Sequence, residues 1–202
     1  VESPERAADI RAVLKTRPDA NAIARLSADP RYNSTIRTTC VATRFDAGHA
    51  NNALPQKAQA NVNCRILPGH SAESVRQQLI HVFDDPKVAV RYKDINGELV
   101  DRAPDTKSFA PPPLRSDVLK PLEQIAAQMW PGAPVLPEME TGASDSKYTM
   151  GTGIPSYGVN GVAIDRDDIR AHGQDERVRV SSYYDGVEFY YRYLKVLTSG
   201  RP

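Results

Sequence analysis

The residues of this chain that could carry chemistry gather in three short segments, of which the first surrounds His172. Carboxylates flank this histidine on both sides, at Asp165, Asp167, Asp168, Asp175 and Glu176. A neutral imidazole is a good zinc ligand, and a nearby carboxylate can hold its second nitrogen and fix the tautomer. No second histidine or cysteine lies close by, so a single metal ligand and an incidental surface histidine in an acidic loop both fit this segment.

The second segment places Asn52 and Arg65 across an expected β-hairpin. Arg65 lies on the polar face of its strand, where a planar guanidinium can bind a carboxylate through two hydrogen bonds. A solvated strand face, with Arg65 in a surface ion pair, produces the same pattern. A substrate clamp and an ordinary strand face therefore both remain open.

The third segment consists of the small residues Gly142, Ala143, Ser144 and Asp145, which lead into a short predicted helix. Free backbone N–H groups at a helix start suit an anionic substrate group. Ser144 or Asp145 could instead cap the helix through a side-chain oxygen. The pattern is equally compatible with both roles.

The elements that must position these segments follow from apolar periodicity. In the first half we predict helical structure over 5–28, broken at Pro18, then strands over 36–45 and 57–66. A helix over 71–83 follows, with Ser71 as its N-cap and an apolar face, and another strand begins at Val88 and Val90. The apolar face of that helix consists of Val75, Leu79, Val82 and Phe83.

A proline-rich stretch, 94–113, separates this half from a second one. There we predict a helix over 116–129 with Pro121 near its first turns, short strands over 135–139 and 154–159, and a final helix over 182–198. The final helix carries a predicted buried stripe of Tyr183, Val187, Tyr190, Leu194 and Leu197. Strand–helix alternation favours an α/β fold, although the strands are few for a complete doubly wound sheet.

Composition narrows the function classes. With 26 Lys+Arg against 25 Asp+Glu, no global field favours nucleic acid or an anionic membrane, and no apolar run approaches the roughly 20 residues of a membrane span. Cys40 and Cys64 are expected to lie near register across the hairpin, and we favour two small buried thiols. A disulfide is the alternative, and it depends on whether the compartment is periplasmic, secreted or cytoplasmic, which the sequence leaves open. The start at Val1 is neither an initiator methionine nor a signal peptide, so we expect a longer precursor.

Taken in order, these motifs resemble a known family, the co-catalytic, di-zinc metallopeptidases that include glutamate carboxypeptidase, aminoacylase and succinyl-diaminopimelate desuccinylase. The resemblance runs from about Arg37 to Leu197. Within the family, the chain is similar above all to the carboxypeptidase-like bacterial members. The spacing of 13 from Asn52 to Arg65 matches the family's substrate-binding Asn and Arg. The motifs are Asn52-Ala53-Leu54-Pro55, Arg65, Gly142-Ala143-Ser144-Asp145, Gly153-Ile154-Pro155 and His172-Gly173-Gln174-Asp175-Glu176.

The resemblance implies a role for each segment. His172 is expected to be the C-terminal zinc ligand, Arg65 to bind the substrate carboxylate, and Asn52 to hold substrate or the oxyanion, across the subunit interface in dimeric members. The turn Gly142–Asp145 is expected to line the substrate pocket. Residues 1–101 then form the remainder of an α+β lid, or dimerisation, domain with a helical lead-in, and residues 102–202 the C-terminal half of an α/β zinc-peptidase catalytic domain.

The resemblance also implies what the chain lacks. The family's other metal ligands and its general-base Glu belong to an N-terminal catalytic half, so we expect no catalytic residue here and only an incomplete site for the two zinc ions. The implied enzyme is a homodimeric amidohydrolase or carboxypeptidase that hydrolyses an amide bond next to a free carboxylate in a peptide or N-acyl amino acid. By itself this fragment is expected to be inactive. The competing hypothesis is a non-catalytic dimerisation or binding module that has lost metal chemistry.

Overall fold

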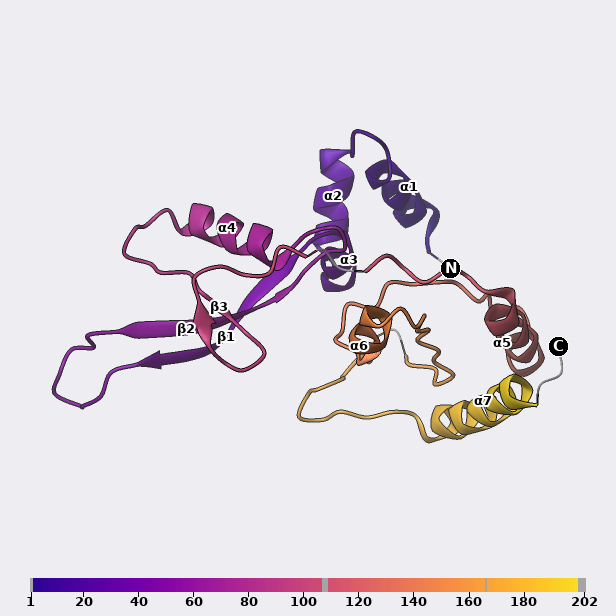
Figure 1. The fold of residues 1–202 in the computed structure, drawn as a ribbon. Coiled ribbons are helices and arrows are strands. Elements are labelled where there is room, and N and C mark those ends of the chain that lie inside the picture. Colours follow the sequence, from indigo (N-terminus) through magenta and orange to yellow (C-terminus); the bar gives the residue numbers. More distant parts are fainter. Residues whose placement is uncertain (1, 107–108, 166, 200–202) are drawn as a thin grey trace. The chain divides into compact units, whose positions relative to one another are not determined.

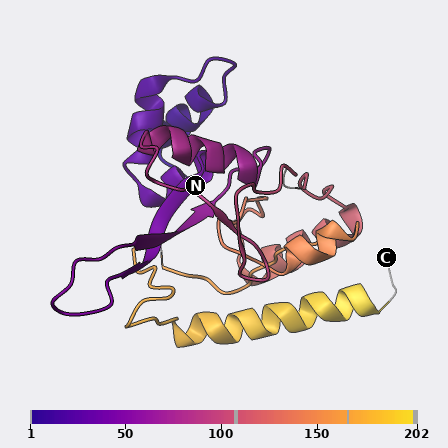
Figure 2. The same cartoon turned by 60° about the vertical axis from the view of Figure 1, so that its left-hand side comes forward.

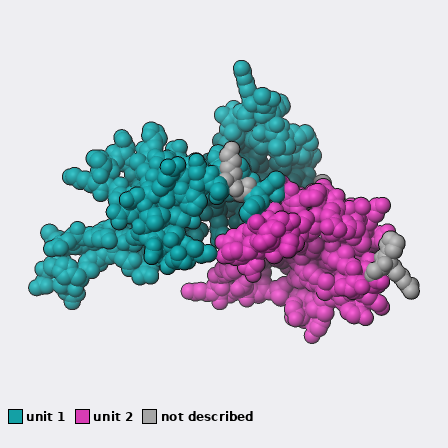
Figure 3. Space-filling view, in the orientation of Figure 1, with its two compact units in different colours: residues 1–110, 139–144 teal, residues 111–138, 145–202 magenta. Residues whose placement is uncertain are grey.

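The structure is a computed structural model that describes residues 2–106, 109–165 and 167–199. The chain forms two compact units, one of residues 1–110 with 139–144 and the other of residues 111–138 with 145–202 (Figure 3). Helices and strands are mixed, as predicted. Among the described residues, no helix has the length and apolar character needed to cross a membrane.

Three short helices open the first unit. Their bounds are Pro4–Val13 for α1, Ala20–Ser27 for α2 and Pro30–Ile36 for α3. Ser3, Asp19 and Asp29 each accept a hydrogen bond from a backbone N–H in the first turn of the helix that follows, which fixes where the helices begin. The predicted break at Pro18 is confirmed, and the helix after it buries Ala22 and Leu26.

A long hairpin follows, made of β1 (Thr39–Ala47) and β2 (Ala58–Arg65) (Figure 1). The strands pair antiparallel, with a register shift between Ala42 and Arg44. Cys40 and Cys64 are direct partners, which confirms the predicted pairing. The favoured interpretation as two buried thiols is wrong, because the two residues form a disulfide and Cys40 is exposed.

Helix α4 (Ala72–Phe83) carries the best-connected polar group of the first unit. Ser71 caps the helix, as predicted, in a capping box with Ser74. In the first turn, the buried Glu73 carboxylate accepts hydrogen bonds from Arg76 (2.8 and 2.9 Å), from Gln77 (2.7 Å) and from the N–H of Ala103 (2.7 Å). These bonds join α4 to the segment that leaves the unit.

Two short strands, β3 (Tyr92–Lys93) and β4 (Leu99–Val100), complete the first unit. The strand predicted to begin at Val88 and Val90 is wrong at its start, since the ladder begins only at Tyr92. The carbonyl of Val90 accepts a hydrogen bond from Arg76 Nη1 (2.9 Å) instead of entering a sheet.

The second unit packs two long helices around an aromatic core. Helix α5 spans Ser116–Met129, as predicted, and continues through Pro121; α6 spans Ser146–Gly151 and α7 spans Val180–Thr198 (Figure 2). Ile125, Phe189 and Tyr193 form the core, and the Tyr193 hydroxyl donates to the carbonyl of Val118 (3.0 Å). The strands predicted over 135–139 and 154–159 are wrong, because neither segment pairs with a strand among the described residues.

Helix α7 buries a different stripe from the predicted one. The buried residues are Ser182, Gly186, Phe189 and Tyr193, whereas the predicted stripe is exposed except for Tyr190, which is half-buried. The small residues allow the chain near Val162 to approach the helix closely. A Cβ at Gly186 would lie 2.5 Å from Val162 Cγ2.

We expect Gly186→Ala to destabilise the second unit. Alanine normally stabilises a helix interior by about 1 kcal/mol over glycine, but the overpacking against Val162 costs about 1–3 kcal/mol and reverses the sign. Thermal unfolding followed by near-ultraviolet circular dichroism measures the change. Ser181→Ala, on the exposed side of the same helix, is the control and should leave the midpoint of thermal unfolding nearly unchanged. A higher midpoint for Gly186→Ala would contradict the close approach of Val162 to the helix.

We expect the Glu73 carboxylate to govern the acid stability of the first unit. Hydrogen bonds from Arg76, Gln77 and the N–H of Ala103 hold the pKa of Glu73 well below its usual range. Because the pKa is lowered on folding, the stabilisation is present above the ordinary carboxyl pKa and is lost as the pH falls below it. Glu73→Gln should therefore lower stability at pH 7 and flatten its decline in acid, measured by urea unfolding from pH 7 to pH 3. Glu98→Gln, an exposed carboxylate in the same unit, should change neither.

Candidate functional site

The hairpin of the first unit carries Asn52 and Arg65 at its two opposite ends. Asn52 lies in the exposed turn that joins β1 to β2, and Arg65 is the last residue of β2, opposite Thr39 (Figure 1). The seven residue steps from Ala58 to Arg65 span about 23 Å at about 3.3 Å each. The structure therefore does not bring these two predicted substrate-binding residues together within one chain.

The environment of Arg65 leaves its guanidinium open. The residue is exposed, and in the described part of the chain no carboxylate forms an ion pair with it. A surface ion pair, the alternative left open by the sequence, is thus not formed with the described residues. An exposed guanidinium at a strand end can bind a carboxylate by donating two parallel N–H hydrogen bonds to it.

The segment Gly142–Asp145 is exposed and leads into a short helix, as predicted, since Asp145 is the N-cap of α6. The Asp145 side chain makes no cap hydrogen bond, so capping by this carboxylate is not observed. The N–H of Gly142 donates to the Glu140 carboxylate (3.0 Å). One N–H group that the sequence predicts as a donor to an anionic ligand is thus already hydrogen-bonded to a carboxylate of the chain.

His172 lies in an exposed loop of the second unit, with a backbone φ of 64°. This left-handed conformation is uncommon for residues other than glycine and often marks functional loops. A turn closes around it, in which the N–H of Gly173 donates to the carbonyl of Arg170 (3.0 Å). The imidazole is therefore presented outward by a constrained turn.

An arginine–aspartate network holds that turn. Asp168 accepts two hydrogen bonds from Arg177 (2.9 and 3.0 Å) and also bonds to Arg170, which contacts Asp175 as well. Arg177, and after it Arg170, lower the pKa of Asp168 to about 2. The sequence interpretation treated these acids as possible companions of His172 and missed the arginines that flank it, although Arg170 and Arg177 bracket the motif in the sequence.

The described residues do not amount to a metal site on their own. They contain no group of three or more His, Cys, Asp or Glu side chains that could hold an ion. The nearby carboxylates Asp165, Asp168 and Asp175 are bonded to arginines. His172 can thus serve as one ligand, and the rest of a zinc site requires groups beyond those described here.

Comparisons with known proteins show what this chain is similar to. Residues 5–91 match the model of the M20 peptidase dimerisation domain. The chain is 26% identical over 174 residues to a probable carboxypeptidase S-like 2 of Dictyostelium discoideum, with 84% of the chain and 31% of the relative covered. It is 28% identical over 170 residues to the N-fatty-acyl-amino acid synthase/hydrolase PM20D1 of Homo sapiens, with 83% and 32% covered.

Aminoacylase-1 of Homo sapiens is 24% identical over 179 residues, with 87% of this chain and 40% of the relative covered. A solved M20 family metallo-carboxypeptidase, Sso-CP2 from Sulfolobus solfataricus, has a similar fold with a TM-score of 0.55 and 16% identity, over 98% of this chain and 43% of that one. The chain thus spans about a third of the length of the first curated relatives.

We expect Asp168→Asn to loosen the turn around His172, because the neutral amide binds Arg177 and Arg170 more weakly than the carboxylate does. Amide exchange at Gly173, whose N–H closes the turn, should become several-fold faster. In the unsubstituted chain the protection of this N–H, which is the slowing of its exchange relative to an unstructured amide at the same pH, should likewise fall as the pH drops from about 4 towards 2, since Arg177 and Arg170 lower the pKa of Asp168 to about 2. Asp167→Asn is the control, because no described residue forms an ion pair with Asp167. Equal acceleration by both variants would show that the arginine–aspartate network does not hold the turn.

Proposed function

Because this chain belongs to the M20 peptidase family and carries its dimerisation domain at residues 5–91, we propose that it is the substrate-binding and dimerisation part of a zinc-dependent amidohydrolase. The relatives' names support hydrolysis of an amide bond next to a free carboxylate, in a peptide or an N-acyl amino acid. Since the chain spans about a third of their length, we assign the other zinc ligands and the general base to further parts of a longer polypeptide.

The observation that carries this proposal is the separation of Asn52 from Arg65. Both residues are exposed and polar, and they lie at opposite ends of one hairpin, about 23 Å of strand apart. This distance is too long for one scissile amide and its adjacent carboxylate to bridge. A symmetric dimer resolves the separation, because Arg65 of one subunit and Asn52 of the other can then serve the same site.

Each residue has a chemical role in such a site. The Arg65 guanidinium binds the substrate carboxylate through a bidentate pair, which orients the amide. The Asn52 amide donates a hydrogen bond to the carbonyl oxygen, where negative charge develops. His172 contributes one ligand to the zinc centre, which activates water when the metal is bound. The segment Gly142–Asp145 lines the pocket beside the bound substrate.

The first test is hydrolysis of N-acyl amino acids and of peptides with a free C-terminus by the complete polypeptide. Activity should disappear on chelation and return with zinc, while substrates capped as C-terminal amides should react poorly. Residues 1–202 alone should show no activity, since the described residues contain no group of three or more possible ligands that could hold zinc. A complete polypeptide that loads no zinc and hydrolyses no such amide would instead support the non-catalytic dimerisation module.

A subunit-mixing experiment tests the shared site. Asn52→Ala and Arg65→Ala homodimers should each lose most of their activity. Re-assembled from an equal mixture, they should recover roughly a quarter of full activity, because half the dimers are mixed and each holds one intact site. The control mixes the doubly substituted chain with the unsubstituted one, whose mixed dimers should be inactive. Active mixed dimers in this control would place both residues on the same subunit.

A further inference from the structure

The free end of the hairpin is an uncharged loop. This tip loop, residues 48–56, joins β1 to β2 and extends beyond the strands (Figure 1), and all of its residues are exposed. It contains no Asp, Glu, Lys or Arg, although these residues make up 25% of the chain, and its single titratable side chain is that of His49. Charged residues are depleted where a surface is covered by a partner, so the composition of the tip loop suits a covered surface.

The tip loop presents one large apolar side chain, that of Leu54. Among the described large hydrophobic residues it has the highest exposed fraction, 90%. Pro55 follows it, and a residue before proline is restricted to extended backbone. The two arms of the loop lie close together, since a Cβ at Gly48 would be 3.9 Å from Pro55 Cγ. Leu54 therefore projects from a restricted backbone, two residues after Asn52.

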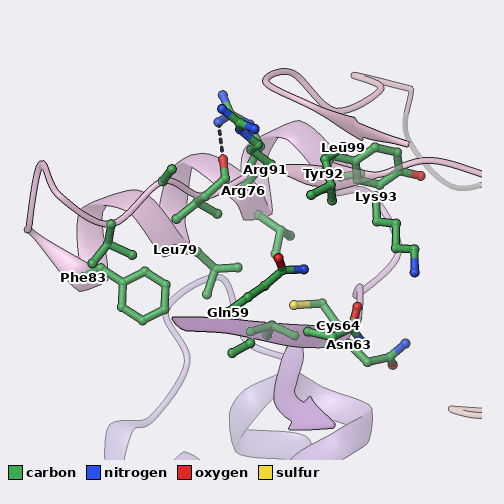
Figure 4. Close-up of a pocket in the computed structure, with 18 of the residues that line it drawn as sticks. Gln59, Asn63, Cys64, Arg76, Leu79, Phe83, Arg91, Tyr92, Lys93 and Leu99 are labelled. Atoms are coloured by element: carbon green, nitrogen blue, oxygen red, sulfur yellow. Dashed lines mark hydrogen bonds between the residues drawn. The ribbon is translucent and has the colours of Figure 1, made fainter. Parts of the chain in front are cut away.

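Within the first unit, the tip loop lies apart from the surface that the rest of the hairpin lines. Strand β2 borders a groove with α4, and residues 57–64 form its strand side (Figure 4). No residue of the tip loop lines that groove. Asp46, just before the loop, is ion-paired with Arg44 (3.0 Å) and brings no free carboxylate to the tip. The side chain of Leu54 can thus enter the partner subunit's site together with Asn52.

Leu54 has the reach to contact a substrate that Asn52 binds. Two residue steps place the Cα atoms of Asn52 and Leu54 at most about 7 Å apart. In the proposed dimer, Asn52 donates to the carbonyl oxygen of the scissile amide, while Arg65 of the other subunit binds the carboxylate. The carboxylate side of the substrate is then held by one subunit, and the acyl side lies next to the tip loop of the other.

We propose that Leu54 determines the acyl-group specificity of the partner subunit's site, by packing against an aliphatic acyl group of an N-acyl amino acid. This role rests on the proposed function, because it needs the site shared between Asn52 and Arg65. In a dipeptide, a free ammonium stands on the acyl side, next to Leu54 and to a loop without a carboxylate. Burying a charge without a partner is costly, so the site selects against such peptides.

Selectivity between acyl groups tests this role in the complete polypeptide. The probes are the acetyl, butanoyl and octanoyl amides of the amino acid that it releases fastest, and the glycyl dipeptide of that amino acid. Leu54→Ala should lower kcat/KM for the octanoyl substrate about 10- to 100-fold and change the acetyl substrate by less than about threefold, because only a long acyl group reaches the side chain. Ile95→Ala, 86% exposed in the β3–β4 turn, is the matched control and should change neither.

Three results separate this proposal from the proposed function. If the unsubstituted polypeptide hydrolyses none of these amides, the proposed function fails and the role of Leu54 fails with it. If it hydrolyses them and Leu54→Ala leaves the octanoyl-to-acetyl ratio unchanged, the role of Leu54 alone is overturned. An equal loss for all acyl groups overturns it as well, because Leu54 then contacts protein instead of substrate.

A charge at this position gives the converse test. Leu54→Asp places a carboxylate beside the free ammonium of the dipeptide, whereas Leu54→Asn has the same shape without the charge. The ratio of dipeptide to octanoyl hydrolysis should be more than about tenfold higher for Leu54→Asp than for Leu54→Asn. Equal ratios in the two variants would contradict a contact with the acyl side of the substrate.

Mixed dimers of Asn52→Ala and Arg65→Ala identify the subunit that supplies Leu54. Their single intact site takes Asn52 from the Arg65→Ala chain. Leu54→Ala on that chain should lower the octanoyl-to-acetyl ratio as it does in the homodimer, and on the Asn52→Ala chain it should leave the ratio unchanged. The reverse pattern would place Leu54 in the site of its own subunit and overturn the proposal.

Discussion

The arrangement of the first unit depends on one buried carboxylate. The Glu73 carboxylate accepts hydrogen bonds from Arg76, from Gln77 and from the N–H of Ala103. Helix α4 and the segment at Ala103 therefore share one polar centre. A buried charge is tolerated only where it is paired and fully hydrogen-bonded. The same Arg76 guanidinium donates to the carbonyl of Val90, so the segment that follows α4 is also held by this centre.

A second constraint is the register of the hairpin. Each step along a strand adds about 3.3 Å, and one register places Cys40 opposite Cys64, Arg65 at one end and the Asn52 turn at the other. The disulfide links the two strands at the Arg65 end. A hairpin of this length holds the two proposed substrate-binding residues, Asn52 and Arg65, apart. For this reason the proposed function requires a dimer, in which the two residues come from different subunits.

Local signals in the sequence predicted local structure well. The Ser71 cap, the helix over 116–129, the break at Pro18 and the Cys40–Cys64 pairing all follow from neighbouring residues or from one hairpin, and the structure confirms them. The candidate site was accessible only through motif order, and its roles stay predictions. The arginines around Asp168 were missed, because ion pairs that hold a loop leave no periodic pattern in the sequence.

The wrong predictions share one physical cause. The sequence predicts strands at Val88 and Val90 and over 135–139 and 154–159, and a buried stripe on the last helix that includes Tyr183 and Leu194. Each of these predictions rests on apolar residues that recur at the period of a strand or a helix. Such a pattern records burial against a partner, and no described residue pairs with these segments or covers that stripe. The apolar face of α4 shows the same condition, because Val75, Leu79 and Phe83 line a groove while Glu73 is the only buried residue of the helix.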